Sequence, residues 1–199
     1  MSANEDQKPQ ESANYGDVNT RIGKKTRKLF HESGWKALAI DPSINTVGFA
    51  TLQFDRSTED KMLDWSWGMW ELDGWSLLQR CQDLVIRICD EGHDDFSELI
   101  IEWPMFYESE RGQVAAQQGY TINLAAVGMY VAGWFQLPIS NITLVTAPQW
   151  KGNVSKATTA RRFMRQFGVD AINVDQNAID AVMMLYAHAT KQGWTLPDL

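Results

Sequence analysis

The order of apolar and polar residues between positions 36 and 72 follows the period of two that β-strands show. Strands are predicted over residues 36–41, 46–55 and 62–72. Along the third strand, every second residue is large and apolar: Leu63, Trp65, Trp67 and Met69. The connections between the three strands are short, so we expect them to form an antiparallel meander.

A helical period takes over after residue 75. Apolar residues recur every three or four positions from 75 to 90, and Gly92 ends the pattern. Two short apolar runs, ELIIEWP at 98–104 and NITLVTAP at 141–148, predict two further strands. The remaining helices are predicted over 113–135, 155–167 (with Ser155 as N-cap) and 175–192 (with Asp175 as N-cap).

This order of elements predicts an α/β fold. Three antiparallel strands followed by strand–helix units give a mixed five-stranded sheet with helices on its faces. A chain of 199 residues suits one domain of this kind. Residues 1–33 are polar and basic and lack any period, so we expect a disordered N-terminal tail, followed by the folded domain over 34–199.

Charge is segregated along a chain whose net charge is −7. Residues 55–110 are strongly acidic, whereas 151–168 carry five basic residues and no acid: Lys151, Lys156, Arg161, Arg162 and Arg165. A second basic group precedes the first strand: Arg21, Lys24, Lys25, Arg27 and Lys28. Such groups can form a phosphate-binding face on an acidic protein, or they can be solvated surface patches. Charge alone leaves both interpretations open.

The two cysteines and the hydropathy of the chain exclude several classes of protein. Cys81 and Cys89 are eight residues apart on a predicted helix, about 12 Å along its axis, which is too far for a disulfide. Two cysteines also cannot form a cysteine-rich zinc site. No apolar stretch is long enough to span a membrane, and the N-terminus resembles no secretory signal. We therefore expect a soluble cytoplasmic protein.

Three acids are candidates for one site. Asp41 ends the first predicted strand and Glu102 ends the fourth, and the ends of neighbouring strands in α/β sheets converge on one crevice. Asp180 lies between Ile179 and Ala181 near the start of the last helix, where a carboxylate needs a partner. Taken singly, Asp41 could cap a turn and Glu102 could pair with an arginine.

Together, these acids predict a metal site. Asn177 is three residues before Asp180 and shares its helix face. Oxygen ligands without histidine or cysteine suit Mg²⁺ or Mn²⁺. Two such ions about 4 Å apart form the clamp used in phosphodiester hydrolysis. We therefore predict that Asp41, Glu102, Asn177 and Asp180 bind two divalent ions.

Four segments resemble the motifs of one family. IDPSINTVGFA, LIIEWP, WKGNVSKATTARR and NAIDAVMMLYAH are similar to the motifs of RuvC-type Holliday junction resolvases, which have the ribonuclease H-like fold, and QWKGNVSK resembles their bacteriophage branch. The resemblance spans residues 37–188. It implies that Asp41, Glu102 and Asp180 are the catalytic, metal-binding acids, and that Lys151 and Lys156 lie near the scissile phosphate.

At one position the chain departs from the family pattern. The family usually has aspartate or histidine three positions before the last acid, where this chain has Asn177. A neutral amide is a weaker ligand, so either one metal binds less tightly or Asp175 completes the site.

After Glu102 comes the aromatic segment WPMFYESERG, and the family inserts an aromatic residue of this loop at the centre of the junction. Phe106 is the first candidate for this DNA contact and Tyr107 the second, stacking on bases; packing beneath the loop is the alternative.

A helix that is apolar on all sides suggests a homodimer. NLAAVGMYVAGWF at 123–135 has more apolar residues than one buried stripe needs. A symmetric dimer would cover the excess and present two active sites to a two-fold symmetric four-way junction. The alternative is a helix buried within one subunit.

The sequence thus predicts a metal-dependent endodeoxyribonuclease that resolves four-way (Holliday) or otherwise branched DNA by phosphodiester hydrolysis, in a bacterial or phage-infected cell. The DNA would contact Lys151, Lys156, Arg161, Arg162 and Arg165. Two alternatives stay open: a ribonuclease H-like nuclease acting on flaps, forks or RNA, and a catalytically weakened protein that binds branched DNA. The ATP-binding relatives of this superfamily are a further possibility, but the sequence contains no glycine-rich phosphate loop.

Overall fold

A five-stranded sheet forms the centre of the computed structural model, which describes residues 35–54, 63–105 and 110–192. Its strands are β1 (Trp35–Pro42), β2 (Thr46–Phe54), β3 (Leu63–Glu71), β4 (Glu98–Glu102) and β5 (Ile142–Val145). The spatial order is β3-β2-β1-β4-β5. β1, β2 and β3 pair antiparallel, and β4 pairs parallel with both β1 and β5. The predicted mixed sheet is confirmed.

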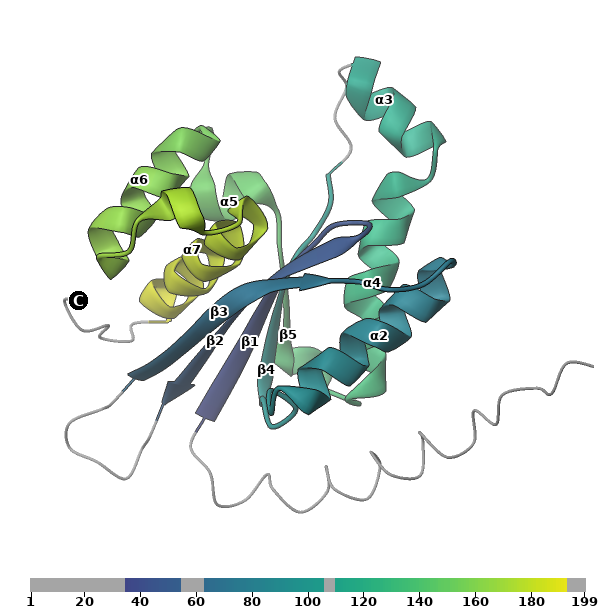
Figure 1. Cartoon of the computed structure of the whole chain (residues 1–199), viewed down its shortest axis with the longest axis horizontal. Helices are drawn as coiled ribbons and strands as arrows, with labels where there is room; N and C mark the ends of the chain where they lie inside the picture. Colours follow the sequence, from purple (N-terminus) through teal and green to yellow (C-terminus); the bar gives the residue numbers. More distant parts are fainter. Residues whose placement is uncertain (1–34, 55–62, 106–109, 193–199) are drawn as a thin grey trace, which may run out of the picture.

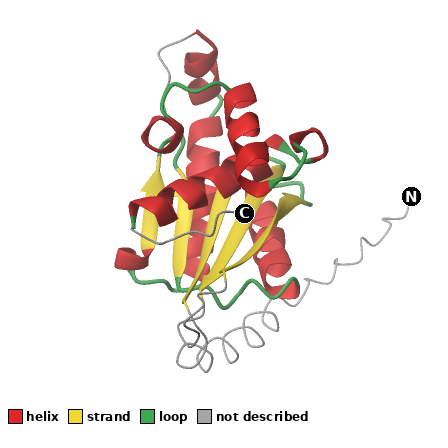
Figure 2. Ribbon diagram, turned by 90° about the vertical axis from the view of Figure 1, so that its left-hand side faces the viewer, coloured by secondary structure: helices red, strands yellow, loops and turns green. Residues whose placement is uncertain are grey.

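Helices cover both faces of the sheet. They are α2 (Leu77–Asp90), α3 (Glu110–Gln117), α4 (Tyr120–Trp134), α5 (Ala147–Lys151), α6 (Lys156–Phe167) and α7 (Gln176–Lys191), with 3₁₀ turns η1 (Ile139–Asn141) and η2 (Ala171–Asn173). Figure 1 shows α2 and α4 on one side of the strands and α5, α6 and α7 on the other. Figure 2, turned by 90°, shows helices in front of the strands and behind them. The chain therefore has the predicted three-layer α/β architecture.

Alternation along the central strand produces two separate cores. Leu38 and Ile40 of β1 belong to the core on the side of α2 and α4. Ala37 and Ala39 belong to the other core, which includes residues of α6 and α7. The small alanine side chains allow α7 to lie close to the strands. All four residues are fully buried, as expected for the central strand of a sheet covered on both faces.

The N-caps of two helices are confirmed. The Ser155 side chain accepts a hydrogen bond from the Thr158 backbone N–H at the start of α6. The Asp175 side chain accepts one from the Asn177 N–H, at 2.7 Å, at the start of α7. Each cap satisfies a backbone donor that has no partner within its helix. The predicted starts of both helices are correct within one residue.

Two helix predictions need correction. The single helix predicted over 113–135 is two helices, α3 and α4, because the chain turns at Gly119, which has a left-handed φ of 74°. The short helix α5 was not predicted, since its five residues with Pro148 resemble the end of a strand. A capping box between Thr146 and Gln149 starts this helix.

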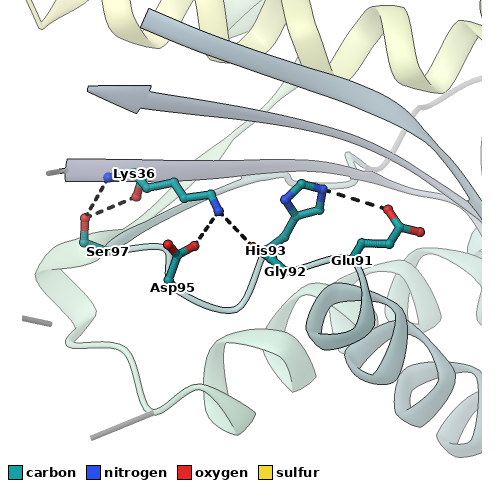
Figure 3. Close-up of polar contacts among 6 residues, drawn as sticks. All are labelled: Lys36, Glu91, Gly92, His93, Asp95 and Ser97. Atoms are coloured by element: carbon teal, nitrogen blue, oxygen red, sulfur yellow. Dashed lines mark hydrogen bonds and ion pairs between the residues drawn. The ribbon is translucent and has the colours of Figure 1, made fainter. Parts of the chain in front are cut away.

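The connection from α2 to β4 is fixed to the start of β1 by the buried side chain of Lys36 (Figure 3). Its Nζ donates to the Gly92 carbonyl at 3.1 Å and forms an ion pair with Asp95. Ser97 bonds the Lys36 backbone through both its own backbone and its side chain. These contacts satisfy a buried charge and fix where β4 enters the sheet beside β1.

Other predictions concern single residues and the chain ends. Cys81 and Cys89 are both free, and Cys81 is buried, so the absence of a disulfide between them is confirmed. Within the described ranges, none of the helices has the length and apolar character that crossing a membrane requires. The predicted tail over residues 1–33 lies outside the described residues.

Candidate active site

Two of the predicted acids stand at the carboxyl ends of neighbouring parallel strands. β1 pairs with β4 in parallel, with Ile40 opposite Ile101. Both isoleucines belong to the core beneath α2 and α4. Because successive side chains alternate, the next residues, Asp41 and Glu102, point to the opposite face, where α7 lies. The sheet register therefore brings these two acids together.

The third acid comes from α7, whose first turn lies directly on β2. Gly48 pairs with Asp41 across the antiparallel ladder. A Cβ atom at Gly48 would lie 2.1 Å from the backbone C and O atoms of Asn177. Only glycine leaves room for the helix backbone there. This close approach places Asp180, one turn further along α7, over the ends of β1 and β4.

The three carboxylates form one cluster, in which an oxygen of each of Asp41, Glu102 and Asp180 lies within 4.8 Å of the others. Burial raises the pKa of Asp41 well above its ordinary value, and the charges of Glu102 and Asp180 raise it further. Burial also raises the pKa of Glu102. Asp180 is itself buried, with 5% of its surface exposed. Such a cluster favours a proton or a metal cation between its members.

Lys151, the last residue of α5, reaches into this cluster. Its Nζ donates to Asp180 Oδ2 at 2.8 Å. Burial lowers the pKa of Lys151, but the hydrogen bond to Asp180 and the charges of Asp180, Glu102 and Asp41 outweigh it, so its pKa is raised. Lys151 is therefore a charged ammonium group beside the carboxylates.

Two further donors contact the acids, and sequence reasoning missed both. The indole Nε1 of Trp150 donates to Glu102 Oε2 at 2.9 Å. The amide Nε2 of Gln176 donates to Asp180 Oδ1 at 2.8 Å. Gln176 precedes Asp180 by four residues, a helical spacing that could have indicated this contact. Trp150 had no comparable signal, because α5 itself was not predicted.

The side chain of Asn177 contacts β2. Its Nδ2 donates to Thr46 Oγ1 at 3.1 Å. Asp175 is exposed and caps α7. Whether the amide oxygen of Asn177 binds a metal stays a prediction, as does a contribution from Asp175.

The remaining site predictions concern the residues expected to contact DNA. Lys156 begins α6 and is exposed, and its charge lowers the pKa values of Asp41 and Glu102. Arg161, Arg162 and Arg165 are exposed along the same helix. Phe106 and Tyr107 lie outside the described residues.

The donor set is chemically suited to a hard divalent cation. Three carboxylates within 4.8 Å of one another offer several oxygens, and Mg²⁺ and Mn²⁺ prefer such ligands. The cluster is partly open, because Asp41 and Glu102 are not fully buried. These acids could therefore bind a metal ion that a substrate can also reach.

The sheet order and the flanking helices are those of a ribonuclease H-like fold. Two solved structures of RuvC from Thermus thermophilus share this fold with the chain. One of them is a complex with a Holliday junction substrate, at a TM-score of 0.54, and the other has a TM-score of 0.55. Each is 14% identical in sequence, and each match covers 79% of this chain and 96% of the RuvC chain.

At this level of identity the likeness shows the fold alone. A scan against protein-family models gives no match, and neither does a search of curated proteins. The likeness to the two RuvC structures, together with the strand order, confirms the fold predicted from the sequence.

Proposed function

We propose that the protein is a metal-dependent, structure-selective DNA endonuclease of the RuvC type, which hydrolyses phosphodiester bonds in four-way or otherwise branched DNA. The observation that carries this proposal is the cluster of Asp41, Glu102 and Asp180, whose carboxylate oxygens lie within 4.8 Å of one another at the ends of β1 and β4. The fold is that of a protein whose structure is solved with a Holliday junction. The similarity of QWKGNVSK to the bacteriophage branch favours a role in a bacterial or phage-infected cell, in its cytoplasm.

The acids are proposed to hold Mg²⁺ or Mn²⁺, as two ions in each site. Asp41, Glu102 and Asp180 supply charged oxygens, and either Asn177 or Asp175 completes the set. Bound there, such ions would supply an activated water molecule and positive charge beside the phosphate. The carboxylates of this chain would hold them.

Lys151 and Lys156 are proposed to act on the scissile phosphate. Lys151 Nζ is 2.8 Å from Asp180 Oδ2, and the charge of Lys156 acts on both Asp41 and Glu102. We therefore expect both ammonium groups to lie near the phosphorus atom of a bound substrate. Positive charge fixed there stabilises the transition state more than the ground state.

The DNA is proposed to run along α6. Helix N-termini attract phosphate groups through unpaired backbone N–H groups, and Lys156 stands at the first position of this helix. Three exposed arginines continue the positive charge away from the acids: Arg161, Arg162 and Arg165. On a chain of net charge −7, such a strip can bind a polyanion. Phe106 and Tyr107 are proposed to stack on bases at the branch point.

A homodimer is proposed through the outer side of α4. Ile122 and Met129 are 68% and 48% exposed and lie two helical turns apart, so the helix presents apolar residues away from its own core. Replacing Ile122 with aspartate should give a monomer in sedimentation velocity. Ile139→Asp, at a still more exposed position in η1 (88%), should leave the dimer unchanged. A wild-type chain that sediments as a monomer would contradict this part of the proposal.

The test of the function is cleavage of labelled DNA of defined shape. A four-way junction, a flap, a linear duplex and an RNA–DNA hybrid are incubated with the protein, with and without Mg²⁺. We expect Mg²⁺-dependent cleavage of the branched DNA, with the junction preferred. Preferred cleavage of the flap or the hybrid would instead identify a different nuclease of the same fold.

Single substitutions tie this activity to the acids. Asp180→Asn should abolish cleavage and leave junction binding largely intact, because binding depends on phosphate contacts. Asp170→Asn is the matched control. Asp170 is an exposed acid that caps η2, and asparagine caps equally well. Turnover near the wild-type rate for Asp180→Asn at saturating Mg²⁺ would show that the acids have another role.

A further inference from the structure

The carboxylate of Glu102 is held by a tryptophan. Trp150 Nε1 donates to Glu102 Oε2 at 2.9 Å. An indole N–H can only donate, and a buried tryptophan generally needs an acceptor for it. The ring of Trp150 is partly buried against the core that contains Ile100 and Phe163, so the direction of its N–H is fixed by packing. The bond occupies Oε2 from one side, and within the described part of the chain no hydrogen bond is made to Oε1.

The short path of the chain from β5 to α5 explains why the indole reaches this acid. Glu102 pairs with Val145 at the end of the β4–β5 ladder, and the Trp103 N–H bonds the Val145 carbonyl at 2.9 Å. The capping box of Thr146 and Gln149 then turns the chain into α5 at once. Trp150 therefore returns over the strand end that carries Glu102.

The face of the same indole contacts the next residue. Lys151 Nζ lies 4.6 Å from the centre of the Trp150 ring and 2.8 Å from Asp180 Oδ2. A cation over an indole face is attracted by the π-electrons. The pair of residues thus touches two of the three acids from one side of the cluster, Glu102 through Trp150 and Asp180 through Lys151.

We propose that Trp150 is a positioning residue of the metal site, whose indole N–H sets the direction in which Glu102 presents its other oxygen, Oε1, to a divalent cation. The inference deepens the proposed function and rests on it. Groups that hydrogen-bond metal ligands fix the ligands' orientation, and removing one typically weakens metal binding about 10- to 100-fold. A tryptophan that only filled the core would not have this effect.

The experiment compares Mg²⁺ binding, without DNA, in the wild type and in Trp150→Phe. Phenylalanine keeps an aromatic ring and removes the N–H. We expect the dissociation constant measured by calorimetry to rise about tenfold or more. The matched control is Trp134→Phe. Trp134 lies on α4, on the other side of the sheet, and stacks on Tyr130 at 6.0 Å between ring centres. It should bind Mg²⁺ like the wild type.

Nuclear magnetic resonance on the wild-type chain supplies a readout that does not depend on the variant's fold. The Nε1–H signal of Trp150, identified by its loss in Trp150→Phe or in the conservative variant Trp150→Tyr, should shift as Mg²⁺ is added, with the midpoint found by calorimetry. It should also shift in Glu102→Gln. The signal of Trp134 should move in neither case.

Each outcome decides the inference. A folded Trp150→Phe chain that binds Mg²⁺ as tightly as the wild type would overturn it, as would a Trp150 signal that ignores both Mg²⁺ and Glu102→Gln. Either result leaves the proposed nuclease intact if the wild type binds Mg²⁺. A wild-type chain that does not bind Mg²⁺ overturns the metal site itself and this inference with it.

Discussion

Replacing Asp41 with asparagine removes one negative charge from the carboxylate cluster and hardly changes the size of the side chain. One carboxylate oxygen of each of the three acids lies within 4.8 Å of the others. At that distance two unit charges repel by about 3.5 kcal/mol when the effective dielectric constant is about 20. Burial is the first cause of the raised pKa of Asp41, followed by the charges of Glu102 and Asp180. Without a metal, an ionised Asp41 should therefore destabilise the folded chain.

The size of this effect has an upper limit. The folded chain can instead keep Asp41 protonated, which costs a free energy of about 1.4 kcal/mol for each unit by which the pH exceeds the ordinary pKa of 3.8. That limits the penalty to about 5 kcal/mol at pH 7.5, and the charges of Lys151 and Lys156 offset part of it. We expect Asp41→Asn to stabilise the metal-free protein by about 1–3 kcal/mol. For a chain of this length, that raises Tm by about 3–9 °C.

The pH dependence follows from the direction of the shift. Because the pKa of Asp41 is higher in the folded state, the folded chain binds this proton more tightly than the unfolded chain does. The destabilisation is absent well below pH 3.8, where both states are protonated, sets in as pH rises through 3.8, and grows until pH reaches the folded pKa. The stability that Asp41→Asn gains over the wild type should therefore be largest near neutral pH and small near pH 4.

The assay is thermal unfolding, followed by circular dichroism in EDTA between pH 4 and pH 8. Asp170→Asn is the control, since that exposed acid lies outside the cluster. Added Mg²⁺ should then raise the Tm of the wild type and not that of Asp41→Asn, because a ligand stabilises only the chain that binds it. The reasoning is refuted if Asp41→Asn melts at or below the Tm of the wild type in EDTA at pH 7.5. It is also refuted if the difference in Tm between the variant and the wild type does not change with pH.

Two further predictions concern the helix that carries Asp180 and the basic strip. Gly48→Ala should lower Tm and weaken Mg²⁺ binding, because the Cβ of the new alanine would lie 2.1 Å from the Asn177 backbone. Gly133→Ala, whose Cβ would meet nothing within 4 Å, should change neither Tm nor Mg²⁺ binding. Equal behaviour of the two variants would contradict the role of Gly48. Replacing Arg161 and Arg162 with alanine should weaken junction binding and reduce the slope of log affinity against log salt by about two, measured by fluorescence anisotropy. An unchanged slope would mean that the DNA runs elsewhere.

The acids at the strand ends were predictable because the physics behind them is local. Strand alternation fixes which face a residue points to, and the apolar runs before Asp41 and Glu102 identify buried strands. Asp180 stood out because apolar neighbours on a helix leave a carboxylate without a partner. The fold followed from the order of elements, which allows few arrangements of a mixed sheet.

The donors around the acids could not be predicted in the same way. Trp150 meets Glu102 across 48 residues of sequence, and that contact depends on the turn after β5. The break at Gly119 depends on a single left-handed residue, which the surrounding apolar period conceals. Gln176 is the exception, since its spacing from Asp180 is local. Contacts between distant segments require the register of the sheet, which the sequence pattern does not contain.

The donors are distributed unequally over the three acids, and this inequality predicts which acid matters most for a cation. Asp180 accepts from Lys151 and Gln176, and Glu102 accepts from Trp150. Among the contacts of the described residues, no hydrogen bond to the Asp41 carboxylate is present. β1 lies between β2 and β4, so Asp41 stands on the central strand of the sheet.

A cation should therefore gain most from Asp41, whose charge is compensated least within the chain. We expect Asp41→Asn to abolish Mg²⁺ binding in calorimetry and Glu102→Gln to weaken it without abolishing it. Both substitutions remove one charge, so the difference isolates the position of the acid. If Glu102→Gln loses more affinity than Asp41→Asn, the cation is centred nearer to β4 than the distribution of donors implies.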